Sequence, residues 1–158
     1  PQTEGQLPLV YNHKPTGRGD DYHDLSGEPL FPFGYGLSYT SFQYTNLQLS
    51  KKKINSHEQI AVTCAITNTG NYAGEETVQL YIRDKVGSIV RPVKELKDFK
   101  KIKLAAGETK TVSFLISREK LSFYNEQLQW VAEPGDFELM IGASSRDIRL
   151  KSAFELVK

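Results

Sequence analysis

The residues that could do acid–base chemistry gather near the start of the sequence. Acidic side chains cluster at Asp20, Asp21, Asp24 and Glu28. Two carboxylates can hydrolyse a glycosidic bond when a scaffold holds them about 5–9.5 Å apart and separates their pKa values. The sequence predicts no regular element around this cluster, and the other acids are scattered over turns and polar strand faces. We therefore expect no catalytic residue in this chain and no hydrolytic activity from the chain alone.

Metal binding and nucleophilic catalysis are also not indicated. His13, His23 and His57 lie in separate predicted loops without metal-ligand spacing. Cys64 is the only cysteine, which excludes an internal disulfide, and it sits at the centre of a predicted strand where a thiol is buried and unreactive. No glycine-rich loop leads into a helix to bind phosphate. We expect no metal and no cofactor.

Charge and hydropathy bound the possible partners. The chain has 20 Lys and Arg against 19 Asp and Glu, so no global field attracts nucleic acid or an anionic membrane. Lysines cluster at residues 51–53 and 94–103, where Glu95 and Asp98 dilute the second cluster; alternating lysines are typical of solvated edge strands. No apolar run approaches the ~20 residues that span a bilayer. We expect neither a nucleic-acid nor a membrane partner.

Two short patterns are compatible with a binding function, but each also has an ordinary structural explanation. The Arg-Gly-Asp tripeptide at residues 18–20 occurs in integrin-binding adhesins, but three residues recur by chance and are ordinary loop chemistry. Trp130, Tyr81 and Tyr124 would make a stacking platform for sugar rings. We favour the alternative, in which the lone Trp130 packs in or beside a hydrophobic core.

The elements that must position these residues are short strands. From Tyr39 onward, alternating apolar residues are separated by turn signals, and a break near Thr45 and Asn46 suggests a bulge. The apolar positions of the eight predicted strands are Phe42, Tyr44, Leu47 and Leu49; Ile60, Val62, Cys64 and Ile66; Val78, Leu80 and Ile82; Leu96, Phe99, Ile102 and Leu104; Val112, Phe114 and Ile116; Leu128, Trp130 and Ala132; Phe137, Leu139 and Ile141; and Ile148, Leu150, Phe154 and Leu156.

This pattern predicts an all-β fold, an immunoglobulin-like or fibronectin type III-like β-sandwich. One helical turn is expected at residues 117–121, capped by Ser117. Residues 1–36 hold 11 of the 19 Gly and Pro residues, which predicts an extended, loop-rich N-terminal segment. The expected inter-sheet core consists of Val62, Ile66, Leu80, Ile82, Phe114, Phe137, Leu139 and Ile141.

The most specific motif lies where these two parts meet. Residues 32–42 read Pro-Phe-Gly-Tyr-Gly-Leu-Ser-Tyr-Thr-Ser-Phe, which closely resembles a signature of glycoside hydrolase family 3, the family of many β-glucosidases and β-xylosidases. Features downstream agree with the fibronectin type III-like domain of that family, including residues 91–99 (Arg-Pro-Val-Lys-Glu-Leu-Lys-Asp-Phe) and residues 133–137 (Glu-Pro-Gly-Asp-Phe). The resemblance covers essentially the whole chain.

The resemblance implies a division of the chain and a role for it. Residues 1–36 would be the tail end of a preceding α/β domain plus an interdomain linker, and residues 37–158 the β-sandwich. The chain would be a non-catalytic C-terminal accessory domain whose partners are the catalytic domains of the same polypeptide and the carbohydrate substrate of the parent enzyme. The resemblance also implies a periplasmic or extracellular location. An independent carbohydrate-binding or adhesion module is the alternative.

Two sets of residues are the candidate sites. In the interdomain signature, the glycines would permit a tight crossing between domains while the large side chains wedge into the joint; its residues are Phe33, Gly34, Tyr35, Gly36, Leu37 and Tyr39. The loop at residues 12–28 would either border the active site of the parent or be a solvated connector. Its candidate residues are Arg18, Asp20, Asp21, Tyr22 and His23.

Overall fold

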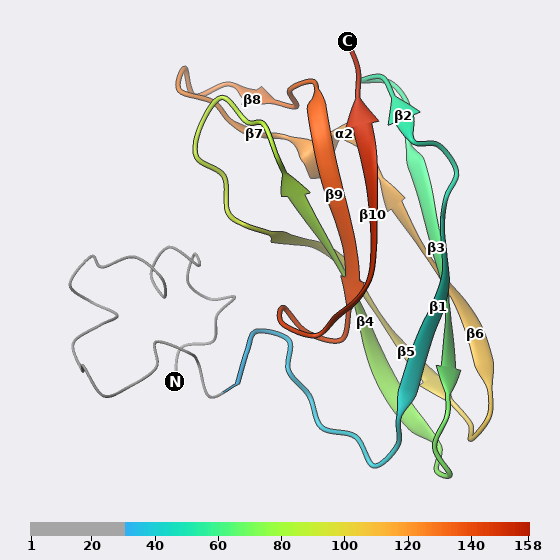
Figure 1. The fold of residues 1–158 in the computed structure, drawn as a ribbon. Helices are drawn as coiled ribbons and strands as arrows, with labels where there is room; N and C mark the ends of the chain where they lie inside the picture. The colour runs from blue at the N-terminus through green and yellow to red at the C-terminus, as the bar shows by residue number, and fades with distance from the viewer. Residues whose placement is uncertain (1–30) are drawn as a thin grey trace, which may run out of the picture.

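A computed structural model describes residues 31–158, which form two β-sheets packed face to face (Figure 1). One sheet has three strands in the order β1-β3-β6, and the other has five in the order β2-β10-β9-β4-β5. The strands are β1 (Phe42–Leu49), β2 (Lys53–Ile54), β3 (Ile60–Asn68), β4 (Gly74–Asp84), β5 (Glu95–Leu104), β6 (Thr109–Ile116), β9 (Gly135–Gly142) and β10 (Ile148–Leu156). The all-β sandwich expected from the sequence is confirmed.

Antiparallel pairing dominates both sheets, as the strict alternation of apolar residues predicts. β3 pairs with β1 and β6, and β4 pairs with β5 and β9, all antiparallel. The predicted break in the first strand is present: the register of β1 against β3 shifts between Thr45 and Gln48, and Asn46 has a φ of 54°. A bulge there increases the local twist of the strand.

The core lies between the two sheets and matches the predicted residues. All eight expected core side chains are 3% exposed or less. Phe137 and Phe154, on the paired strands β9 and β10, stack with their ring centroids 5.2 Å apart. Cys64 is buried as expected, and burial raises the pKa of its thiol to about 11, so the thiolate is scarcely populated at neutral pH.

The lysine clusters lie at the edges of the five-stranded sheet, as predicted for solvated edge strands. β2 and β5 are its two outermost strands. Lys53 on β2 pairs with Glu155 at 2.7 Å, and Lys101 on β5 pairs with Glu75 at 2.6 Å. These lysines therefore cover unpaired strand edges and are partly neutralised by neighbouring acids.

The region after β6 differs most from the sequence prediction. The sixth expected strand is reduced to β8 (Trp130–Val131), which pairs with β7 (Phe123–Tyr124) in a small hairpin. Leu128 is not in this strand, because it occupies the turn with a φ of 58°. The helical turn is present as α2 (Arg118–Leu121), but the Ser117 side chain makes no capping hydrogen bond. Within residues 31–158, no helix is long and apolar enough to cross a membrane.

Candidate functional site

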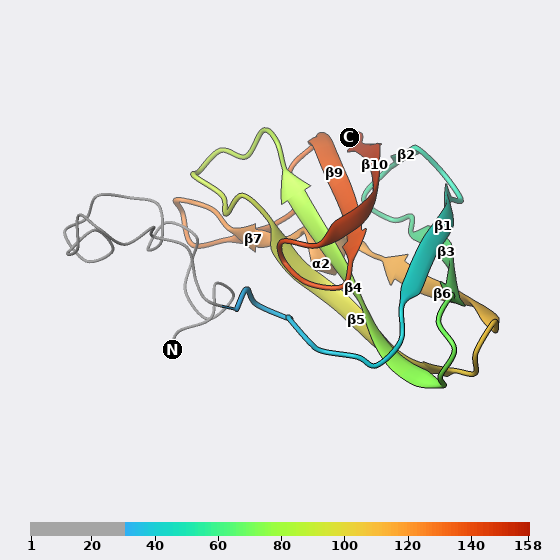
Figure 2. The same ribbon diagram turned by 60° about the horizontal axis from the view of Figure 1, so that its bottom comes forward.

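A concave surface lies beneath residues 31–41, which we call the linker. The linker runs past β4 and β5 before it enters β1 (Figure 2). Between them is an open groove of about 860 Å³, lined on the sandwich side by residues of β4, β5, the β9–β10 loop and the start of β10, including Gln79, Phe99, Ser144 and Arg149. All six residues of the predicted interdomain signature line this groove.

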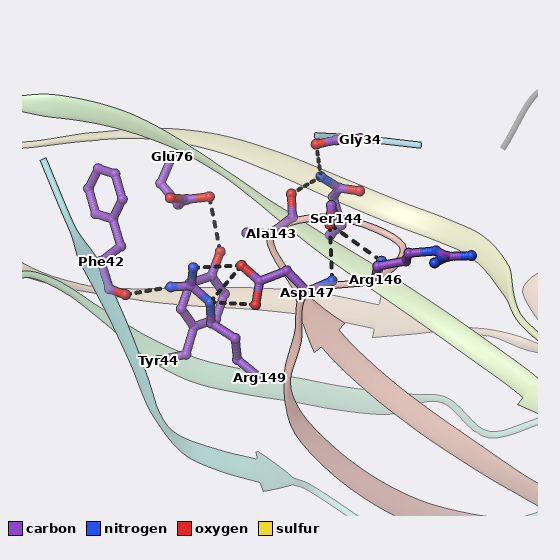
Figure 3. Close-up of polar contacts among 10 residues, drawn as sticks. Gly34, Phe42, Tyr44, Glu76, Ala143, Ser144, Arg146, Asp147 and Arg149 are labelled. Carbon is purple, nitrogen blue, oxygen red and sulfur yellow. Dashed lines mark hydrogen bonds and ion pairs between the residues drawn. The ribbon is translucent and has the colours of Figure 1, made fainter. Parts of the chain in front are cut away.

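Gln79 of β4 holds the linker against the sandwich. Its side chain is 3% exposed, and its Nε2 donates to the carbonyl oxygens of Gly34 at 3.1 Å and Ala143 at 2.6 Å. Its Oε1 accepts a hydrogen bond of 2.5 Å from the Tyr81 hydroxyl. Figure 3 shows the carbonyl groups of Gly34, in the linker, and Ala143, in the β9–β10 loop, bonded to the same amide nitrogen. One buried amide therefore joins the linker, β4 and the β9–β10 loop with its hydrogen-bonding groups satisfied.

Gly34 is the signature position at which only glycine fits. Its φ is 78°, a conformation that side chains rarely adopt, and a Cβ there would overlap the Gln79 amide. A second contact fixes the same segment, since the Ser145 backbone N–H donates to the Phe33 carbonyl at 2.8 Å. Gly36 has a negative or extended φ, and no atom lies within 4 Å of its Cβ direction. The two signature glycines thus have different requirements.

The large side chains of the signature point largely away from the sandwich. Leu37 is 87% exposed and Tyr39 is 98% exposed, while Tyr35 and Phe31 stack on each other with ring centroids 5.2 Å apart. Phe33 is half-buried. The wedge expected of these side chains remains a prediction, because it concerns a joint with a domain that lies outside this chain.

The far end of the linker is fixed by a second buried amide. Asn68, fully buried at the end of β3, accepts a hydrogen bond of 2.6 Å from the Thr40 hydroxyl through its Oδ1. Its Nδ2 donates to the carbonyl oxygens of Tyr72 at 2.8 Å and Leu104 at 3.2 Å. Gln79 and Asn68 thus hold the linker at both ends.

A charged cluster closes the groove beside β1 and β10 (Figure 3). The Tyr44 hydroxyl donates to Glu76 at 3.1 Å, and the Arg149 guanidinium lies 4.8 Å from the Tyr44 ring centroid while pairing with Asp147 at 2.7 Å. Arg149 also donates to the Phe42 carbonyl. Burial raises the pKa of Glu76, and burial together with Glu76 raises the pKa of Tyr44. The cluster links the two sheets at this edge, and its hydrogen-bonding groups are already engaged with one another.

The second candidate site, in the loop at residues 12–28, is not covered by the structure. Arg18, Asp20, Asp21, Tyr22 and His23, and with them the Arg-Gly-Asp tripeptide, lie outside the described residues. Across residues 31–158, no group of three or more His, Cys, Asp or Glu side chains is placed to hold a metal ion.

The aromatic platform considered from the sequence exists in part. Tyr124 and Trp130 face each other across the β7–β8 hairpin with ring centroids 4.9 Å apart. Tyr81 is buried, with 2% exposure, and does not join them. The favoured interpretation of Trp130 was wrong: its side chain is 52% exposed and is absent from the core cluster, because the short hairpin carries it out of the sandwich.

The chain is similar to a part of several known glycosidases. The fibronectin type III-like domain family matches residues 76–145. The whole chain is 43% identical to a putative β-xylosidase of Formosa agariphila, and 99% of it is 41% identical to a periplasmic β-glucosidase of Salmonella typhimurium. A β-glucosidase structure from Listeria innocua, solved in complex with glucose, superimposes on the full chain with a TM-score of 0.83 at 42% identity. The chain spans only 21–23% of the length of these relatives.

Proposed function

Because this chain corresponds to a C-terminal part of glycoside hydrolase family 3 proteins and carries their fibronectin type III-like domain, we propose that it is an accessory domain that supports the catalytic domains of the same polypeptide. The β-sandwich holds the linker in one conformation and presents its large side chains to the preceding domain. We place the boundary between the part that belongs to the preceding domain and its interdomain connection (residues 1–36) and the sandwich domain (residues 37–158) within this linker, between residues 36 and 37. In this function the domain contributes stability and orientation to the parent protein.

The division of the linker into a bound side and an exposed side carries this proposal. Gln79 binds the linker backbone at Gly34 and Asn68 binds the Thr40 hydroxyl, whereas Leu37 and Tyr39 are almost fully exposed. Large apolar side chains that a fold holds outward in a fixed segment favour burial against a partner. A partner in the same polypeptide needs little affinity, because the covalent link raises its effective concentration.

The names of the relatives suggest a substrate and a cellular location for the parent protein. Relatives are named β-xylosidase and β-glucosidase, and one of them is named periplasmic. We infer that the parent hydrolyses β-linked glucosides or xylosides in the periplasm or outside the cell.

The loop at residues 12–28 has two possible roles in the parent: it borders the substrate, or it serves as a connector between domains. Alanine at Tyr22 or Arg18 would raise KM at unchanged thermal stability in the first case and leave KM unchanged in the second.

Combined alanine substitutions at Leu37 and Tyr39 test the docking role. In the full-length parent, the double variant should lower Tm by several degrees, because it removes apolar surface buried between domains. In the 158-residue chain the same variant should leave the unfolding midpoint unchanged, since both side chains are exposed there. Leu115→Ala, on the outer face of β6 and 48% exposed, is the control and should affect both proteins equally. An unchanged Tm in the full-length double variant would contradict the proposal.

A further inference from the structure

The β7–β8 hairpin exposes a pair of aromatic rings at the opposite end of the sandwich from residues 37–41 (Figure 1). Tyr124 is 60% exposed and Trp130 is 52% exposed, and their ring planes are inclined by 56°. The two residues are direct partners in the strand pairing, so both rings project from the same face of the hairpin. Neither ring lines the linker groove.

The hairpin holds this pair rigidly through its own hydrogen bonds. The Asn125 side-chain Oδ1 accepts from the backbone N–H groups of Gln127 at 3.0 Å and Gln129 at 2.9 Å. The Asn125 backbone N–H donates to the Gln129 carbonyl at 3.0 Å. On the opposite face of β7, Phe123 is buried, with the Arg91 guanidinium 4.2 Å from its ring centroid. Little conformational entropy is lost when such a preformed pair binds a ligand.

The chemistry around the rings suits a neutral, hydroxyl-rich ligand. Gln127 is exposed in the turn that joins the two strands and offers an amide donor and acceptor, which hydrogen-bond hydroxyl groups. Gln129 is also exposed, but its Oε1 accepts from the Asn125 amide on the other face of the hairpin. The electron-rich faces of the rings attract the weakly positive C–H groups on the flat face of a pyranose. Glu126, exposed in the same turn, disfavours a phosphate backbone but does not repel an uncharged sugar.

The exposed area of the pair is too small for a stable protein interface. A Tyr or Trp side chain offers about 150–250 Å² in all, so two half-exposed rings present roughly 200 Å². A specific protein–protein interface buries about 800 Å² on each partner. The area instead matches one or two stacked sugar rings.

We propose that Tyr124 and Trp130 form a glycan-binding site at which the uncharged residues of a β-linked xylan or glucan chain stack on the two rings, while Gln127 in the adjoining turn hydrogen-bonds its hydroxyl groups. This site is separate from the linker and goes beyond the supporting role. It brings the domain to the polymer from which the substrates of a β-xylosidase or β-glucosidase derive. Binding is weak for one sugar ring and strengthens with chain length.

Trp130 makes the site directly observable, since it is the only tryptophan in the chain. Titration of the 158-residue chain with xylohexaose or cellohexaose should change the tryptophan emission in a saturable way. In native gels that contain soluble xylan or mixed-linkage β-glucan, the chain should be retarded. Trp130→Ala and Tyr124→Ala should each weaken the retardation by about tenfold, the equivalent of one stacked ring.

Two controls separate the site from general stickiness. Leu128→Gly keeps both rings on the same hairpin, and Tyr72→Ala removes an exposed aromatic ring from another loop; both should be retarded like the original chain. The double alanine variant at Leu37 and Tyr39 should also keep its retardation, so failure of the docking proposal would not affect this one. Unchanged emission with both hexasaccharides, or equal retardation of Trp130→Ala and the original chain, would overturn the proposal.

Discussion

The linker and the β7–β8 hairpin both present aromatic side chains to solvent, but they are held in place by different means. Among the described residues, the linker has one internal backbone–backbone hydrogen bond, from Tyr35 to the Pro32 carbonyl, and one from the Thr40 N–H to the Ser38 hydroxyl. Its other hydrogen bonds go to residues of the sandwich, namely Gln79, Asn68, Thr69 and Ser145. The hairpin has its own strand pairing and its own turn, fixed by Asn125.

This difference indicates two kinds of surface. The conformation of the linker is set by its contacts with the sandwich. A segment held in this way can fix the orientation of a neighbouring domain, which suits a joint between domains. A hairpin that holds its aromatic pair by local bonds is preorganised for a ligand without help from another domain. Exposure of aromatic residues alone would not distinguish the two regions; the origin of their hydrogen bonds does.

Loss of the shared scaffold should disrupt both regions together and is the largest expected effect. Phe137→Ala removes a side chain that is 1% exposed and stacked on Phe154, at a cost of about 3–5 kcal/mol in the free energy of unfolding. Denaturant unfolding measures this loss. A loss below about 1 kcal/mol would show that Phe137 does not belong to the inter-sheet core.

Substitution of Gly34 should disrupt the linker and leave the hairpin intact. Gly34→Ala places a Cβ against the Gln79 amide at a positive φ, which we expect to destabilise the chain by about 2 kcal/mol and to expose the linker to proteases. The matched control is Gly36→Ala, which meets no atom within 4 Å and should change stability by less than about 0.5 kcal/mol. Equal effects of the two substitutions would refute the special role of Gly34.

Relief of strain in the hairpin turn should have the smallest effect and the opposite sign. Leu128 is 80% exposed and has a φ of 58°, so its side chain costs conformational energy and contributes little burial. Leu128→Gly should stabilise the chain by about 0.5–1 kcal/mol in the same unfolding assay. The fluorescence of Trp130 should stay unchanged, because its ring partner Tyr124 is retained. Destabilisation would mean that the Leu128 side chain is needed in the turn.

Alternation of apolar residues was enough to predict most of the sandwich. The strands from Ile60 to Asn68 and from Thr109 to Ile116 follow their patterns closely, since every second residue faces a single continuous core. The prediction of a sixth sandwich strand failed. Leu128 and Trp130 have the spacing of a strand, but they belong to a hairpin outside the sandwich. Periodicity reports which residues share a face, not whether that face is covered.

The candidate site was less accessible to sequence reasoning. Gln79 occupies a polar strand position that would ordinarily be solvated, and nothing in its spacing reveals that it is buried under the linker. Asn68 is in phase with Ile66 on the inward face of β3, but its spacing does not reveal that it binds the linker. Tyr81 looks like Trp130 as an aromatic residue in a predicted strand, yet one is buried and the other exposed. The hydrogen bonds of Asn68 reach Thr40 in the linker and Leu104 in β5, which lie 28 and 36 positions away, and the sequence does not indicate such contacts.

The amino-acid sequence by itself determined the strand pattern, the composition of the core and the glycine-rich character of the linker, because these depend on local backbone preferences and on the period of two along a strand. The tertiary structure decided which side chains contact residues that are distant in the sequence. Gln79 meets Gly34, 45 positions away, and Tyr124 meets Trp130 because of strand pairing. Such contacts depend on how the sheets, the linker and the hairpin pack in three dimensions, and the one-dimensional pattern carries no record of that packing.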